Sequence, residues 1–223
     1  MSNAGRMGRP RLQPRDGTGD TADEILAAAS ALFGDHGVDG TTMAQIASSA
    51  GLQQSSLYYY FRSKEEILAT IVAKANVVPL ELVRRVRDQP SAPAVRLWRF
   101  VAGDVIAPCA LPFDINEVHR IAARDRDRFA TYWRERRTLQ AGLAAILREG
   151  IADRSLREVD PRFVAITLMS NDEAVQNWYR HDTRPLRDPA AIGAAMADLA
   201  VGGLLRRPAD LEKVGEQARA VVA

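Results

Sequence analysis

Cysteine and lysine are scarce in this chain of 223 residues. The single cysteine, Cys109, excludes an intrachain disulfide framework and a cysteine-based zinc cluster, and it fits a reducing compartment. Three of the 30 basic residues are lysines (Lys64, Lys74 and Lys213), so 27 are arginines. Arginine keeps its charge and suits the recognition of phosphates and carboxylates. A GC-rich genome would produce the same bias.

Long hydrophobic runs are also missing. No apolar stretch reaches the roughly 18 residues that span a bilayer, and the N-terminus carries no continuous hydrophobic segment of the secretory kind. We therefore expect a cytoplasmic protein without a membrane partner. The hydrophobic fraction of 47% and charged fraction of 26% are ordinary for a globular protein, and a net charge of +2 excludes a polybasic coating.

Signatures of catalysis are absent as well. The sequence has no phosphate-binding loop, no Gly-x-Ser-x-Gly elbow and no His-Glu-x-x-His pair, and its three histidines are widely separated. These absences argue against an enzyme. The sequence predicts no cofactor and no bound metal.

Strand-like alternation is not found, and apolar residues recur at helical spacing instead. We predict an all-α protein with a flexible basic arm (1–20), a first helical domain (21–66) and a second, larger helical domain (67–223). Pro79 lies within a helical pattern and predicts a kink or break. Beyond residue 88, helices are expected at about 92–107, 114–122, 125–150, 160–181 and 188–206, with a short one after Pro208.

The segment from Thr41 to Lys64 carries the clearest functional signal. Ala44, Ala47 and Ala50 let one short helix pack closely on another, and Gly51 suits a left-handed turn. The helix after the turn exposes polar and aromatic residues rather than charges. This is the arrangement that a helix-turn-helix needs, because its second helix presents a polar face to the major groove. That face comprises Gln53, Gln54, Ser55, Ser56, Tyr58 and Tyr59.

The same region resembles the DNA-binding domain of the TetR/AcrR family of transcriptional regulators. The matching features are Ala28-x3-Leu32-Phe33, Gly37, Gly40-Thr41-Thr42, Ile46-Ala47, Ala50-Gly51 and Leu57-Tyr58-x-Tyr60-Phe61-x-Ser63-Lys64. The resemblance implies phosphate contacts from Thr42, Tyr58, Tyr60 and Lys64. It implies base contacts from Gln54, Ser55 and Tyr59, with Gln53 and Ser56 at the margin. Gln53 and Ala44 depart from residues common in relatives, so the operator sequence does not transfer.

The N-terminal arm carries a second signal. Gly8-Arg9-Pro10-Arg11 resembles the Gly-Arg-Pro core of hooks that enter the minor groove. Arginine is favoured there because a narrow A/T-rich groove has a strongly negative floor. We predict that Arg9 and Arg11 contact DNA; the alternative is a solvated tail.

The resemblance also implies a homodimer whose interface is formed by the last two long helices. Small residues there permit close helix approach, and two recognition helices must reach successive major grooves about 34 Å apart. The alternative is that these residues form only intrachain core. The residues predicted at the interface are Val164, Leu168, Val175, Trp178, Ile192, Ala195, Met196, Leu199 and Gly203.

A small-molecule effector, hydrophobic or acyl-coenzyme A-like, is expected in the second domain. Buried polar groups in an apolar pocket would fix its orientation. His119 with Asp172 or Glu173 could hold a metal, but nothing in their spacing requires one, and a surface or hydrogen-bonded histidine is the favoured interpretation. The predicted lining comprises Trp98, Val101, Val105, Cys109, Phe113, His119, Phe129, Trp133, Asn171 and Asp172.

Taken together, these features predict a ligand-responsive transcriptional regulator that a small molecule releases, as a repressor, from a palindromic operator in double-stranded DNA. Two alternatives stay open at this point. One is an enzyme on an all-helical scaffold, and the other is a protein-interaction module that does not bind DNA.

Overall fold

A computed structural model describes residues 21–179 and 188–220 of the chain. The chain divides into two compact units, Met1–Ile71 and Val72–Ala223. The predicted arm, including Arg9 and Arg11, lies outside the described residues. Each unit is helical, and within the described part of the chain the β-type pairing is limited to one isolated bridge between Leu156 and Leu205. The predicted all-α fold class is therefore confirmed.

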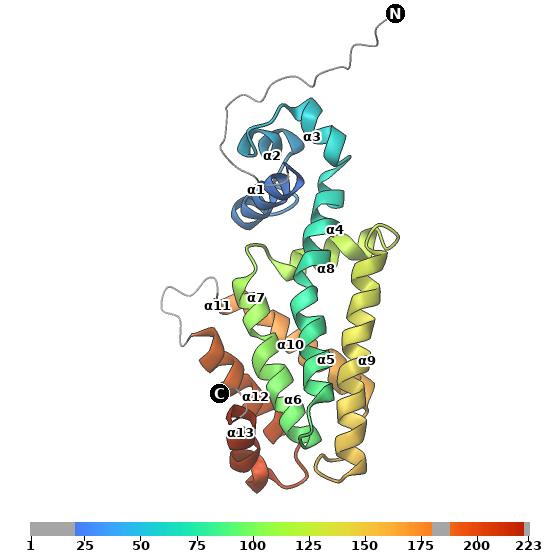
Figure 1. The fold of residues 1–223 in the computed structure, drawn as a ribbon, viewed down its shortest axis with the longest axis vertical. Helices are drawn as coiled ribbons and strands as arrows, with labels where there is room; N and C mark the ends of the chain where they lie inside the picture. Colours follow the sequence, from blue (N-terminus) through green and yellow to red (C-terminus); the bar gives the residue numbers. More distant parts are fainter. Residues whose placement is uncertain (1–20, 180–187, 221–223) are drawn as a thin grey trace, which may run out of the picture. The chain divides into compact units, whose positions relative to one another are not determined.

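The first unit packs three helices and the start of a fourth around a small apolar core (Figure 1). Its buried residues recur every three or four positions along α1, so that one face of that helix turns inward. The two short helices that follow contribute fewer residues each. The elements are α1 (Thr21–His36), α2 (Met43–Ser49), α3 (Gln54–Tyr60) and α4 (Lys64–Ala75), the last of which crosses into the second unit.

Two glycines make the turns of this unit. Gly37 ends α1 with a φ of 72°, and Gly51 lies between α2 and α3 with a φ of 69°. Residues with a Cβ rarely adopt this left-handed backbone conformation, whereas glycine adopts it without steric cost. The predicted left-handed turn at Gly51 is confirmed.

The second unit surrounds one central helix, α6, with the remaining long helices (Figure 1). Helices α5, α9, α10, α12 and α13 all contact α6, and most α6 side chains are buried. The elements are α5 (Val77–Asp88), α6 (Pro93–Asp104), α7 (Ile106–Ala110), α8 (Ile115–Arg124), α9 (Ala130–Ala152), α10 (Pro161–Ala174), α11 (Gln176–Tyr179), α12 (Pro189–Gly202), η1 (Pro208–Asp210) and α13 (Leu211–Arg219).

Prolines explain several helix boundaries. α4 and α5 separate at Asn76, and Pro79 lies in the first turn of α5, where its missing N–H is tolerated. The predicted break near Pro79 is thus confirmed. Pro108 offers no N–H to the Asp104 carbonyl, and α6 ends at that residue. The helix expected over 92–107 is accordingly two helices, α6 and α7.

The other helices of this unit lie where the periodicity predicts them, with ends shifted by a few residues. The helix expected at 160–181 is interrupted at Val175, which separates α10 from α11. No helix in the described ranges combines the length and the apolar content required to cross a membrane.

The contact between α6 and α12 is close because of one glycine. A Cβ placed on Gly193 would lie 2.2 Å from the backbone oxygen of Ala102. Backbone cannot yield as a flexible side-chain tip can, so α12 would have to move away from α6. A Cβ placed on Gly215 in α13 would instead meet only the flexible end of the Arg219 side chain, at 3.0 Å.

We therefore predict that Gly193→Ala lowers the free energy of unfolding by about 1–3 kcal/mol, because overpacking forces the backbone to shift. Gly215→Ala is the control and should not lower the free energy of unfolding, because the Arg219 side chain can move and glycine is unfavourable inside a helix. Urea denaturation at fixed protein concentration measures both values. Equal stability of the two variants would contradict the close approach of α12 to α6.

Candidate DNA interface and effector domain

The helix-turn-helix geometry is set by burial on one side of α2 and α3. Ile46 and Ala47 on α2 and Leu57 on α3 are buried, so the two helices share the core of the first unit. Thr42 starts α2 with a capping box: its hydroxyl accepts the Gln45 N–H at 3.3 Å, and the Gln45 side-chain oxygen accepts the Thr42 N–H at 2.8 Å. These contacts fix α2 without using any charge.

The opposite side of α3 is exposed and polar. Tyr59 is the most open of the three tyrosines, with 86% of its surface accessible against 48% for Tyr58 and 40% for Tyr60. Gln53, Gln54 and Ser55 are also exposed, whereas Ser56 is half-buried. Glutamine can pair with an adenine edge and tyrosine hydroxyls can reach phosphate oxygens, so this face has the chemistry of a major-groove reader.

Lys64 has a structural role that the sequence did not reveal. Its Nζ donates to the backbone oxygens of Val38, Asp39 and Thr41, at 2.7, 3.2 and 3.1 Å. An ammonium group has three hydrogens, and here each has a carbonyl acceptor. Lys64 therefore ties the start of α4 to the loop that precedes α2, while the predicted phosphate contact by its charge stays a prediction.

In the second unit, His119 belongs to a hydrogen-bonded polar network. Its Nε2 lies 3.0 Å from Oε2 of Glu173, and its Nδ1 meets the hydroxyl of Tyr132. Arg136 forms a second ion pair with the Glu173 carboxylate. Burial raises the pKa of Glu173, but the hydrogen bond from His119 and the charge of Arg136 more than offset this, so the net shift is downward.

Beside this network lies a pair of buried carboxyl groups, which we call the acid pair: Asp104 on α6 and Asp172 on α10. Both oxygens of Asp172 are buried without a hydrogen-bond partner. Burial, and then the charges of Asp104 and Glu173, raise the pKa of Asp172; burial and Glu173 raise the pKa of Asp104 against the opposing charge of Arg136. Each residue also lies in the last turn of its helix, where negative charge is disfavoured.

The predicted ligand residues do not share one cavity. Trp98 lines a groove between α5, α6, α12 and α13, whereas exposed Asn171 lines a different depression beside α12. Cys109 packs with Val105 against Val175 and Ile192. Val101, Phe113 and Phe129 are fully buried core, and the Trp133 indole donates to the Ala122 carbonyl at 3.0 Å. No group of three or more potential metal ligands occurs among the described residues, and His119 is held by protein partners.

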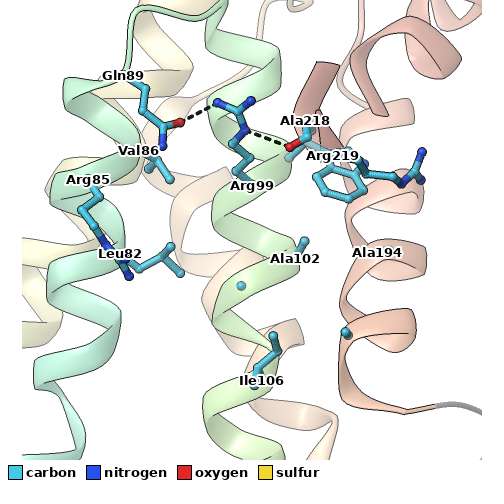
Figure 2. A pocket seen from close by; sticks show the side chains of 13 residues that line it. Leu82, Arg85, Val86, Gln89, Arg99, Ala102, Ile106, Ala194, Ala218 and Arg219 are labelled. Atoms are coloured by element: carbon cyan, nitrogen blue, oxygen red, sulfur yellow. Dashed lines mark hydrogen bonds between the residues drawn. The ribbon is translucent and has the colours of Figure 1, made fainter. Parts of the chain in front are cut away.

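The groove that Trp98 lines is a cavity of the second unit that sequence reasoning missed (Figure 2). Its volume is about 550 Å³, within the usual range of ligand pockets. Alanines and glycine provide the room and arginines provide the polarity. The lining comprises Leu82, Arg85, Val86, Gln89, Trp98, Arg99, Ala102, Gly103, Ile106, Ala190, Ala194, Ala218 and Arg219. The alanines and the glycine among these residues do not stand out in the hydrophobic pattern of a sequence.

The predicted dimer residues separate into three groups by their exposure. Leu199 is 80% exposed, and Trp178 and Gly203 are exposed as well. Val164, Ala195 and Met196 are half-buried, whereas Leu168, Val175 and Ile192 are buried within the chain. The sequence missed Phe163 and Ile166, two exposed apolar residues on α10.

Two family models match the chain. "Bacterial regulatory proteins, tetR family" matches residues 25–71, and "Tetracyclin repressor-like, C-terminal domain" matches residues 116–204. Together they cover more than half of the sequence, and the first coincides with the helix-turn-helix described above. The chain is a DNA-binding transcriptional regulator, and it belongs to the TetR family. The resemblance predicted from the sequence is confirmed.

Individual relatives are similar to this chain over most of its length. The HTH-type transcriptional repressor KstR2 of Mycolicibacterium smegmatis is 25% identical over 194 residues, which cover 84% of this chain and 92% of the relative. The structure of KstR2 of Mycobacterium tuberculosis has a TM-score of 0.72 at 22% identity, covering 86% of this chain and 98% of that one. AibR in complex with isovaleryl coenzyme A and operator DNA has a TM-score of 0.70 at 23% identity, covering 83% and 98%. These relatives are regulators rather than enzymes.

The exposure of Tyr59 leads to a prediction for the DNA interface. Tyr59→Ala should weaken binding to a specific operator by about 10- to 100-fold, because one good side-chain contact is worth roughly 1–3 kcal/mol. The melting temperature should be unchanged, since the ring contributes little to the core. Gel-shift titration with a duplex from upstream of the protein's own gene measures the affinity. Truncation of the exposed Val78 in the second unit is the control, and equal affinities of the two variants would remove Tyr59 from the interface.

The acid pair leads to a prediction for pH. The pKa of Asp172 is higher in the folded than in the unfolded chain, so the wild type loses stability as pH rises from about 4 through that raised value. The asparagine side chain of an Asp172→Asn variant does not titrate. The stability gained by Asp172→Asn should therefore be greater at pH 8 than at pH 5, by on the order of 1 kcal/mol.

Urea denaturation at the two pH values measures this difference. Asp88→Asn, at an exposed position, is the control, and it should change the free energy of unfolding by the same amount at both pH values. A gain for Asp172→Asn that does not vary with pH would show that the buried carboxyl group is stabilised by a partner in its charged form.

Proposed function

We propose that the protein is a homodimeric repressor that binds a palindromic operator and is released by a small-molecule effector. The observation that carries this proposal is the exposed face of α3. Its accessible side chains are Tyr58, Tyr59, Gln54 and Ser55, while the opposite face of the helix packs into the core of the first unit. A regulator of this kind acts on chromosomal DNA, so we expect it in the cytoplasm.

The dimer is supported by apolar surface on α10 and α12. Phe163 (65% exposed), Ile166 and Leu199 are large apolar side chains in contact with solvent, and Phe163 lies beside a depression that Gly203 also lines. Exposed apolar residues grouped in this way are typical of an interface. Two copies related by a twofold axis would present two α3 helices to the two halves of a palindrome.

Effector binding is supported by the cavity in the second unit and by the relatives. AibR has the same fold and was solved with isovaleryl coenzyme A and operator DNA. We infer that a hydrophobic or acyl-coenzyme A-like molecule binds the second unit of this chain as well. Operator release requires only that the effector bind more tightly to a conformation in which the two α3 helices no longer match successive grooves.

Disrupting the dimer tests the proposal. Leu199→Glu should convert the dimer to a monomer, because it buries an unpaired charge in the interface. Operator affinity should then fall by roughly 100-fold or more, since the second half-site no longer benefits from linkage to the first. Analytical ultracentrifugation and gel shift measure the two effects.

Val78→Glu adds the same charge at another exposed apolar position and should leave both properties unchanged. A Leu199→Glu variant that stays dimeric would contradict the α10/α12 interface. A wild-type protein that binds its own upstream DNA no more tightly than unrelated DNA would contradict the repressor.

A further inference from the structure

The groove between α5, α6, α12 and α13, which we call the arginine groove, has an apolar and a cationic part. Figure 2 shows Ile106, Ala102, Leu82 and Ala194 along one stretch of it, with Arg99 further along α6. Small side chains on α6 and α12 leave a narrow space there. A ligand that filled this stretch would have a slender apolar body.

The cationic part is held by an unusual set of partners. Arg99 donates through Nε to the Ala218 carbonyl at 3.0 Å, through one Nη to the Gln89 side chain at 2.6 Å and through the other Nη to the Gln217 carbonyl at 2.7 Å. These acceptors are all neutral oxygens. With the Ser91 hydroxyl at 3.4 Å, they position the guanidinium group, and none of them is a carboxylate.

Arg85 contributes a second free charge. It is exposed at the groove, and among the described residues no carboxylate lies within ion-pair distance of its guanidinium group. The third arginine, Arg219, stacks over the Trp98 ring at 5.0 Å and pairs with Asp198 at 3.5 Å. Of the three arginines that line the groove, Arg85 and Arg99 therefore have no carboxylate partner among the described residues.

We propose that the arginine groove is a binding site for an amphipathic anion, a slender apolar molecule that ends in a carboxylate or phosphate group. The apolar part would lie along Ala102, Ala194 and Ile106, and the anionic group would face the Arg85 guanidinium group, with Arg99 adding a second positive charge further along the groove. Burial of the apolar part provides most of the affinity, and the guanidinium groups select the charge and fix the orientation. As an assignment of the effector class and its site, the inference rests on the proposed function.

Binding is tested on the full-length protein without DNA, by isothermal titration calorimetry with decanoate, decyl phosphate and decanol. We expect one or both anions to bind with a stoichiometry of one per chain, and the neutral alcohol to bind at least tenfold more weakly. The comparison of the two anions identifies the head group. Decanol binding as tightly as the anions, or no binding of either anion, would overturn the proposal.

Two adjacent arginines provide a matched pair of variants. Arg85→Gln should weaken anion binding about tenfold, the effect of losing one charge-assisted hydrogen bond. Arg84→Gln removes the same charge from the preceding residue of α5. Arg84 lines a different depression, so this variant should leave anion binding unchanged. Ala194→Leu should abolish binding by filling the apolar stretch. Equal effects of the two arginine variants would mean that anions bind only through the general charge of the surface.

A gel shift with the same anion separates this inference from the proposed function. Anion binding that depends on Arg85 but leaves operator affinity unchanged would uphold the arginine groove as a site and contradict effector-driven release. Operator release by an anion that Arg85→Gln does not weaken would uphold release and overturn the assignment of the groove.

Discussion

Burial of α6 is the constraint on which the second unit depends. Helices pack against it from several directions, and Leu97, Phe100 and Val101 are inaccessible to solvent. A helix in this position must be apolar almost all round, and its few polar residues must find partners or stay neutral. Arg99 finds neutral oxygens as partners. Burial at the end of the helix raises the pKa of Asp104 to about 7, which favours its neutral form. The two chemically distinctive regions of the unit are thus consequences of the same packing.

The distribution of charge explains how a nearly neutral chain can bind DNA. The exposed face of α3 consists of glutamine, serine and tyrosine, while Lys64 is engaged by three backbone carbonyls. Much of the arginine content lies in the second unit, where individual residues have identifiable roles. Arg96 reaches Glu149, Arg136 pairs with Glu173, and Arg99 joins α13 to the α5–α6 turn. The arginine bias is therefore partly structural, whatever the composition of the genome.

Sequence reasoning succeeded where the signal is periodic and local. The helices, the turn at Gly51 and the break near Pro79 follow from spacing and backbone chemistry. It failed to find the arginine groove because that cavity is defined by what its residues lack: Ala102, Ala194 and their neighbours are small, and they come from helices far apart in the chain. It also could not separate Leu199, which is exposed, from Ile192, which lies on the same helix but is buried, because both are apolar and only the packing of neighbouring helices distinguishes them.

The acid pair and the arginine groove are both chemically suited to an effector, but they differ in accessibility. Asp172 is fully buried, and its carboxyl group faces protein on every side, so a ligand could reach it only if α6 and α10 separated. The groove is already open, Arg85 has no ion-pair partner among the described residues that an anion would displace, and Arg99 is positioned by carbonyls. Binding to a preformed site costs less reorganisation than binding to a closed one. Helix α6, which forms the floor of the groove, also carries Asp104, so a displacement of α6 by a bound ligand would move Asp104 relative to Asp172, whose carboxyl oxygens have no hydrogen-bond partner.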